Sequence, residues 1–198
     1  MQKLGYTAEP CFLRLKNKEK EIKKFTEEYI DFSNESRTER LTVKRIAKDL
    51  LAAGYKEIEL FGNLKSTNGG LIKKFFVRYL NKTIAAVDLT NADIQNGANF
   101  IISHIDAPRI DLKQHPLLEN SELAMLKTHY YGGIKKYQWV NIPLSLYGYI
   151  ITKRNKKIEL ALGVNDNDAV LVIPDLAPHL SHKTQDTKNI KDAITGEM

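Results

Sequence analysis

Cysteine and long apolar runs are almost missing from this sequence, and each absence excludes a class of protein. The single cysteine, Cys11, rules out an internal disulfide framework and an all-cysteine metal site, so a metal would need His, Asp or Glu ligands. No apolar run approaches the roughly 18 residues of a membrane helix, and residues 1–24 carry charges where a secretory signal needs an apolar core. We therefore expect a cytoplasmic protein that binds no membrane.

Two further absences concern phosphate binding and acyl transfer. The chain has no G-x-G-x-x-G or Walker-type phosphate loop, because Gly69-Gly70 is not followed by Lys-Ser or Lys-Thr. It also has no G-x-S-x-G nucleophile elbow, and Cys11 lies in the irregular amino-terminal stretch. Nucleotide-dependent and serine-hydrolase chemistry are accordingly disfavoured.

The chain does have enough apolar residues for a sizeable core and a modest excess of basic charge. A length of 198 residues suits one large domain or one and a half small ones. The 42% hydrophobic composition is enough to form a sizeable core. The 30 Lys and Arg residues against 24 Asp and Glu residues give a net charge of +6. Basic residues are scattered and often adjoin acids, as in residues 18–21, whereas nucleic-acid-binding proteins gather them on one element. This pattern favours a solvated surface.

The first half of the chain has the periodicity of an α/β layer. Apolar residues spaced by three or four predict helices over residues 16–34 and 36–53, the second with Ser36 and Glu39 as a capping box and Gly54 as its left-handed end. Strands are predicted at 57–61, 74–80 and 83–89, with Asn81-Lys82 as a hairpin turn. The apolar run at 98–102 predicts a central strand that is buried on both faces.

The pattern changes near residue 109. β-rich stretches follow, separated by turn residues, and the polar tail from His182 onward predicts no element. These stretches cover residues 110–113, 123–129, 142–152, 157–162 and 169–173. We therefore predict an α/β region at 1–108 and a mostly β domain at 109–198.

The sharpest chemical feature is the His-x-Asp pair His104 and Asp106, which follows the predicted buried strand. Ligand sites of open α/β sheets form beyond the carboxyl ends of strands, so His104 is a candidate metal ligand and Asp106 a candidate orienting carboxylate. The pair alone is weak, because hydrogen-bonded core histidines beside turn aspartates are common.

The remaining histidines offer an alternative metal site. His179 and His182 stand three residues apart after Pro178, so both could join His104 in a mononuclear zinc site if the β-rich region folded back. His115 and His129 are interpreted as surface or packing residues.

Residues 127–139 mix Lys with Tyr and Trp, as single-stranded nucleic-acid platforms do. Strand packing around the Gly132-Gly133 bend explains the same residues. Because the chain has no recognisable nucleic-acid-binding framework, we predict no nucleic-acid partner.

Four stretches together resemble the aspartyl aminopeptidase and aminopeptidase I family of zinc metallo-exopeptidases, in order and across nearly the whole chain. They are Ile-Ser-His-Ile-Asp-Ala-Pro-Arg at 102–109, the segment 122–139, Ile-Pro-Leu at 142–144, and Ile-Pro-Asp-Leu-Ala-Pro-His-Leu at 173–180. The resemblance implies removal of single amino-terminal residues from peptides at a centre of two zinc ions. It also implies a zinc-peptidase α/β domain carrying an inserted, β-rich dimerisation domain, and dimers grouped into dodecamers.

The resemblance assigns three site residues. His104 matches the first metal ligand, Asp106 matches the active-site aspartate that orients it, and His179 matches the histidine that reaches the substrate site of a neighbouring subunit. Trp139 leads into Val140-Asn141 rather than the acidic-basic pair of the branch that prefers aspartyl substrates, which argues against acidic-residue specificity.

The family's remaining metal ligands and general base follow its inserted domain, and these 198 residues do not contain them. A catalytic zinc takes about three protein ligands, so we expect this segment, as an incomplete α/β domain, to be inactive alone. The alternative is a non-catalytic assembly or binding module that makes subunit contacts through the β-rich part.

Overall fold

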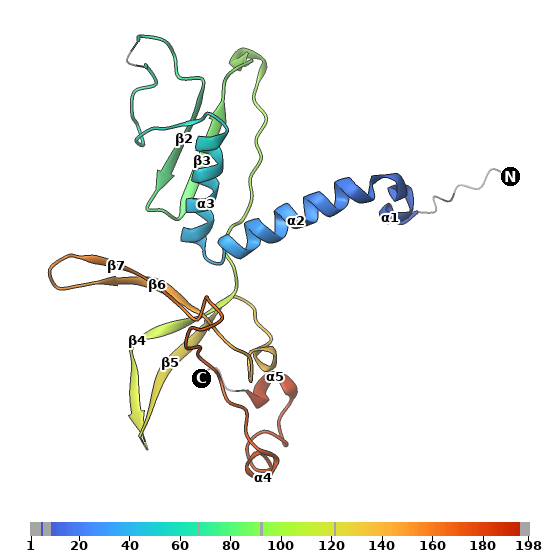
Figure 1. The fold of residues 1–198 in the computed structure, drawn as a ribbon, viewed down its shortest axis with the longest axis vertical. Coiled ribbons are helices and arrows are strands. Elements are labelled where there is room, and N and C mark those ends of the chain that lie inside the picture. Colours follow the sequence, from blue (N-terminus) through green and yellow to red (C-terminus); the bar gives the residue numbers. More distant parts are fainter. Residues whose placement is uncertain (1–4, 6–8, 67, 92, 121, 195–198) are drawn as a thin grey trace. The chain divides into compact units, whose positions relative to one another are not determined.

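The computed structural model describes residues 5, 9–66, 68–91, 93–120 and 122–194. Its helices and strands are mixed, which is the α/β character expected from the sequence (Figure 1). The chain divides into a first unit, Met1–Asp106, and a second unit, Ala107–Met198. No helix in the described parts of the chain is long and apolar enough to cross a membrane.

The first unit contains helices followed by a small mixed sheet. Its elements, in chain order, are α1 (Cys11–Arg14), η1 (Lys16–Lys18), α2 (Glu19–Glu35), α3 (Glu39–Ala52), β1 (Lys56–Glu57), β2 (Lys74–Tyr79), β3 (Thr83–Asp88) and η2 (Ile94–Asn96). The sheet order is β1-β2-β3, with β1 parallel and β3 antiparallel to β2.

Helix α3 and strand β2 supply the buried core of the first unit. Val43 and Phe76 are completely buried, Ala47 is nearly so, and α3 packs on the sheet (Figure 1). The α3 stripe repeats every three or four residues, which is why one helix face can be buried while the other carries the charges. The Arg78 guanidinium bridges β2 to β1 by donating to both Glu57 carboxylate oxygens, at 2.6 and 2.8 Å.

The helix predictions are confirmed, with one error at a cap. The α3 N-cap is Thr38, whose hydroxyl accepts a hydrogen bond from Leu41 N at 3.3 Å, whereas the buried Ser36 hydroxyl has no partner among the described residues. Gly54 ends α3 with φ +83° as predicted, because a residue without Cβ adopts this backbone conformation at little cost.

Two strand predictions in the first unit are wrong. The strand predicted at 57–61 is confined to Lys56–Glu57, and Phe61, with φ +67°, is 98% exposed. Residues 98–102 form no strand, because no strand in the described parts of the chain pairs with them, and they are exposed rather than buried. They lie in the extended trace between η2 and β4, which carries no arrow in Figure 1.

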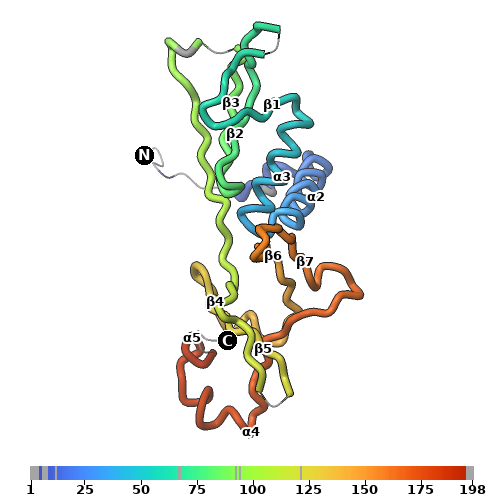
Figure 2. The backbone as a smooth tube through the Cα atoms, turned by 90° about the vertical axis from the view of Figure 1, so that its left-hand side faces the viewer, coloured from blue at the N-terminus to red at the C-terminus, as the bar shows by residue number. Residues whose placement is uncertain are grey.

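The second unit consists of two hairpins and short helices. Its elements are β4 (Arg109–Asn120), β5 (Leu123–Tyr131), η3 (Lys136–Gln138), β6 (Leu146–Ile151), β7 (Lys157–Leu162), α4 (Pro178–Ser181) and α5 (Ile190–Ala193). Strand β4 pairs with β5 and β6 with β7, both antiparallel, as the traces in Figure 2 show. Among its described residues, no hydrophobic side chain is buried.

Two predictions for the second unit need correction. The stretch 169–173 is not a strand, because only Leu171 pairs, in a single bridge to Leu144. The tail from His182 does contain an element, the one-turn helix α5. Local backbone hydrogen bonds, such as Ala193 N to Asn189 O at 2.9 Å, are sufficient for such a turn without an apolar stripe.

Candidate functional site

The His-x-Asp pair lies at the end of the first unit, on the extended segment after η2. The His104 side chain is exposed and makes no hydrogen bond or ion pair with the described residues, whereas Asp106 is half-buried. In extended backbone, alternate side chains point the same way, so both polar groups belong to one side of the segment. The imidazole is therefore accessible to a ligand from outside the first unit.

The chain just after this pair is anchored within the second unit. Gly132 has φ +75°, and a Cβ there would lie 3.5 Å from Pro108 Cα, so the backbone passes close to the proline. Arg109 begins β4 and pairs in register with Tyr131. These contacts fix where the motif ends and the β4–β5 hairpin begins.

His179 lies on α4, a single helical turn of the second unit. Pro178 occupies the first turn, where a missing N–H costs no hydrogen bond, and the buried Ser181 hydroxyl donates to Pro178 O at 3.0 Å. The His179 side chain is exposed. The turn is held further by Asp175, whose carboxylate accepts from Gln185 Nε2 at 3.1 Å. A buried serine thus fixes the turn that presents an exposed histidine.

The alternative mononuclear zinc site would join His104 of the first unit to His179 and His182 of the second, and it stays a prediction. His182 Nδ1 lies 2.9 Å from the Asp186 carboxylate, so this histidine has a local partner. No group of three or more His, Cys, Asp or Glu side chains in the described ranges is arranged to hold a metal ion. A lone imidazole and its neighbouring carboxylate fall short of the about three protein ligands of a catalytic zinc, so the residues present do not by themselves fit the metal centre.

Two aromatic residues of 127–139, Tyr130 and Tyr131, contact cations of their own unit. Arg109 Cζ lies 4.1 Å from the Tyr131 ring centroid, and Lys136 Nζ lies 5.4 Å from that of Tyr130. Both contacts are of the cation–π kind. They match the strand-packing interpretation of this segment.

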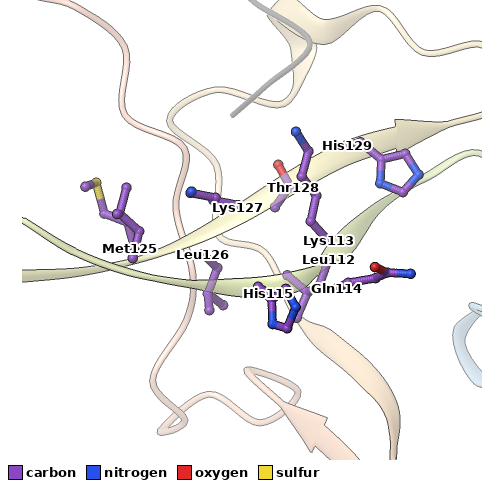
Figure 3. A pocket seen from close by; sticks show the side chains of 10 residues that line it. Leu112, Lys113, Gln114, His115, Met125, Leu126, Lys127, Thr128 and His129 are labelled. Carbon is purple, nitrogen blue, oxygen red and sulfur yellow. The ribbon is translucent and has the colours of Figure 1, made fainter.

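The sequence interpretation missed a groove on the β4–β5 hairpin. The strand register shifts between Leu112 and Leu117, and the bulge places His115 beside a hollow with Met125 and His129 at its opposite ends (Figure 3). Pro116 was the available signal, because proline within a strand marks an edge or a bulge. Lys113 and Lys127 add positive charge to its lining.

Comparisons with known proteins all find similarity to one family of metallopeptidases. The sequence profile of the family described as aminopeptidase I zinc metalloprotease (M18) matches residues 32–197. A probable M18 family aminopeptidase 1 of Borreliella afzelii is 40% identical over 187 residues, which is 94% of this chain and 40% of the relative. The chain thus spans about 40% of the length of the curated relatives it matches.

Solved structures of M18 aminopeptidases are similar to this chain. The crystal structure of an M18 family aminopeptidase from Thermotoga maritima is similar with a TM-score of 0.76 at 36% identity, covering 90% of this chain and 38% of that one. The S. cerevisiae mApe1 dodecamer is similar with a TM-score of 0.59 at 22% identity, covering 78% of this chain and 36% of that one, and shows the shared fold.

Proposed function

Because the chain belongs to the aminopeptidase I zinc metalloprotease (M18) family, we propose that its residues form the amino-terminal part of a zinc aminopeptidase that releases single residues from peptide amino termini. The observation that carries this proposal is the match of residues 32–197, supported by 40% identity to an M18 relative. Residues 1–108 would be part of an incomplete catalytic α/β domain, and 109–198 the β-rich inserted dimerisation domain. The division of the chain after Asp106 supports this assignment.

His104 is proposed as one ligand of a centre of two zinc ions, and Asp106 as the carboxylate that orients its imidazole. Its exposed ring on the extended segment supports this role. Paired metals separated by about 3.5–4 Å recur in aminopeptidases, but these residues offer too few ligands to hold them. The 198-residue chain alone should therefore bind no zinc pair tightly and hydrolyse no peptide.

His179 is proposed as a substrate-contacting residue for a neighbouring subunit. Its exposure on a turn fixed by the buried Ser181 supports this role, because the imidazole is open to another chain. A homo-oligomer of dimers, up to a dodecamer, is the proposed assembly, and the dodecameric form of the structurally similar mApe1 supports it.

The activity can be tested in a chimera in which this chain replaces the matching segment of the Thermotoga maritima relative. Amino-acid release from a peptide mixture is expected, and the same peptides with acetylated amino termini should yield none. Release from both would indicate a different peptidase class. A folded, zinc-loaded chimera that releases nothing would favour the non-catalytic assembly module.

A further inference from the structure

Helix α4 lies in a loop, residues 175–185, that a side-chain bridge closes at its base (Figure 1). One carboxylate oxygen of Asp175 accepts hydrogen bonds from Gln185 Nε2 at 3.1 Å and from Leu176 N at 2.9 Å. Asp175 N donates in turn to Asn141 Oδ1, 34 residues earlier in the chain, at 3.2 Å. A single aspartate thus joins the start of the loop to its end and to a distant segment of the second unit.

The His179 imidazole depends on this loop for its position. The ring is exposed and makes no hydrogen bond or ion pair with the described residues. Its place therefore follows from the backbone of α4. That helix has four residues, and an isolated helical turn of this length is not stable in water by itself. The turn must be held by contacts around it.

The bridge is connected to both sides of His179. Gln185, whose side chain reaches Asp175, also donates its backbone N–H to Ser181 O at 2.8 Å. The Ser181 hydroxyl is buried and donates to Pro178 O at 3.0 Å. Because Pro178 and Ser181 flank the histidine, a continuous chain of hydrogen bonds runs from the bridge to the turn that carries it.

We propose that Asp175 and Gln185 are positioning residues that hold His179 where it contacts the substrate of a neighbouring subunit. This inference rests on the proposed function and deepens it, because it names the side chains that fix the substrate-contacting imidazole. A group that acts on a substrate must be held to within about 0.5 Å, and loops provide less precision than helices or strands. A displacement of about 1 Å lowers a rate by up to roughly a hundredfold.

A double-mutant cycle tests whether Asp175 acts through His179. In the chimera with the Thermotoga maritima relative, Asp175→Ala should lower kcat/KM for peptides at least tenfold. In a chimera that already carries His179→Ala, the same change should lower kcat/KM less than twofold, because the imidazole that the bridge positions is gone. An equal loss in both backgrounds would overturn the proposal, since general damage to the fold gives that result.

Exchange of donor and acceptor tests the bridge itself. Gln185→Glu sets a second carboxylate against Asp175, and repulsion between the like charges should open the loop and lower kcat/KM. Adding Asp175→Asn should restore most of the loss, because the introduced amide donates to the new carboxylate while its oxygen still accepts from Leu176 N. Asp186→Ala, which removes the 2.9 Å contact with His182 beside the loop, is the control and should leave kcat/KM unchanged. No recovery in the double variant, or an equal loss in the control, would contradict the proposal.

Hydrogen exchange separates this inference from the proposed function. Leu180 N and Ser181 N both donate to Ala177 O, at 2.8 and 3.1 Å. Their exchange should be at least tenfold faster in the Asp175→Ala chimera, with the amides of β6 and β7 unchanged as evidence that the unit is folded. Unchanged exchange at both amides would overturn the inference. Faster exchange in a chimera whose kcat/KM is insensitive to His179→Ala would refute the proposed role of His179 and leave the positioning of the turn by Asp175 supported.

Discussion

The guanidinium of Arg109 lies over the ring of Tyr131, with Cζ 4.1 Å from the ring centroid, and the two residues are register partners at the start of β4 and the end of β5. Arg109 Nε also donates to the Asp111 carboxylate at 2.8 Å. The cation is therefore held between a ring and a carboxylate. This arrangement fixes the hairpin end that follows the His-x-Asp pair.

Removing the ring should weaken that end of the hairpin. Tyr131→Ala is expected to destabilise the second unit by on the order of 1 kcal/mol, because the cation–π contact and cross-strand packing are both lost. Tyr131→Phe keeps the ring and should change stability much less. Urea unfolding measures the stability of both variants. Equal losses of stability would show that the Tyr131 hydroxyl, not its ring, stabilises this end of the hairpin.

Asp168 should make the second unit sensitive to acid. Hydrogen bonds from the backbone N–H groups of Asn165 and Val164 lower the pKa of the Asp168 carboxyl. A carboxyl whose pKa is lower in the folded state stabilises that state above its unfolded pKa, and the contribution disappears as pH falls through the folded pKa. Asp168→Ala should thus lower Tm by a few degrees at pH 7, and the difference from wild type should shrink as pH falls below the unfolded pKa of about 4.

Asp166 provides the control for this experiment, because it lies in the same loop, is exposed and makes no hydrogen bond with the described residues. Asp166→Ala should leave Tm unchanged across the same pH range. A constant difference between Asp168→Ala and wild type from pH 7 to pH 3 would contradict the linkage argument.

Phe76 should dominate the stability of the first unit. Its side chain is completely buried at the centre of β2, and a Phe→Ala change in a core costs about 3–5 kcal/mol. Phe76→Ala is therefore expected to unfold most of the first unit at moderate urea, whereas Phe61→Ala, at a 98% exposed position, should be close to neutral. Circular dichroism during urea titration measures the unfolding of both variants. Similar unfolding midpoints for the two variants would show that Phe76 is not the centre of the core.

Sequence periodicity predicted which segments are regular, but not what covers them. The stripe of Ile22, Phe25, Tyr29 and Phe32 predicted α2, and the helix is present. However, Phe25 is 71% and Tyr29 62% exposed. Periodicity reports the local backbone, whereas burial depends on segments far along the chain or on other chains. The failed prediction at 98–102 has the same origin.

The candidate site depended on a different kind of information. His104 and Asp106 were identifiable from their place after an apolar run, whereas His179 emerged only through resemblance to a family. His179 lies on the one-turn helix α4. No local sequence pattern distinguishes this turn from an ordinary surface turn. The β4 bulge was signalled by Pro116, but which side chains line the resulting groove depends on the β4–β5 register.

Zinc content tests the central claim most directly, namely that His104 is a ligand of an M18 metal centre. In the chimera with the Thermotoga maritima relative, elemental analysis should find two zinc ions per chain. His104→Ala should lose at least one of them, and His115→Ala, in the β4–β5 groove, should lose none. A folded His104→Ala chimera that retains the full zinc content would contradict the assignment.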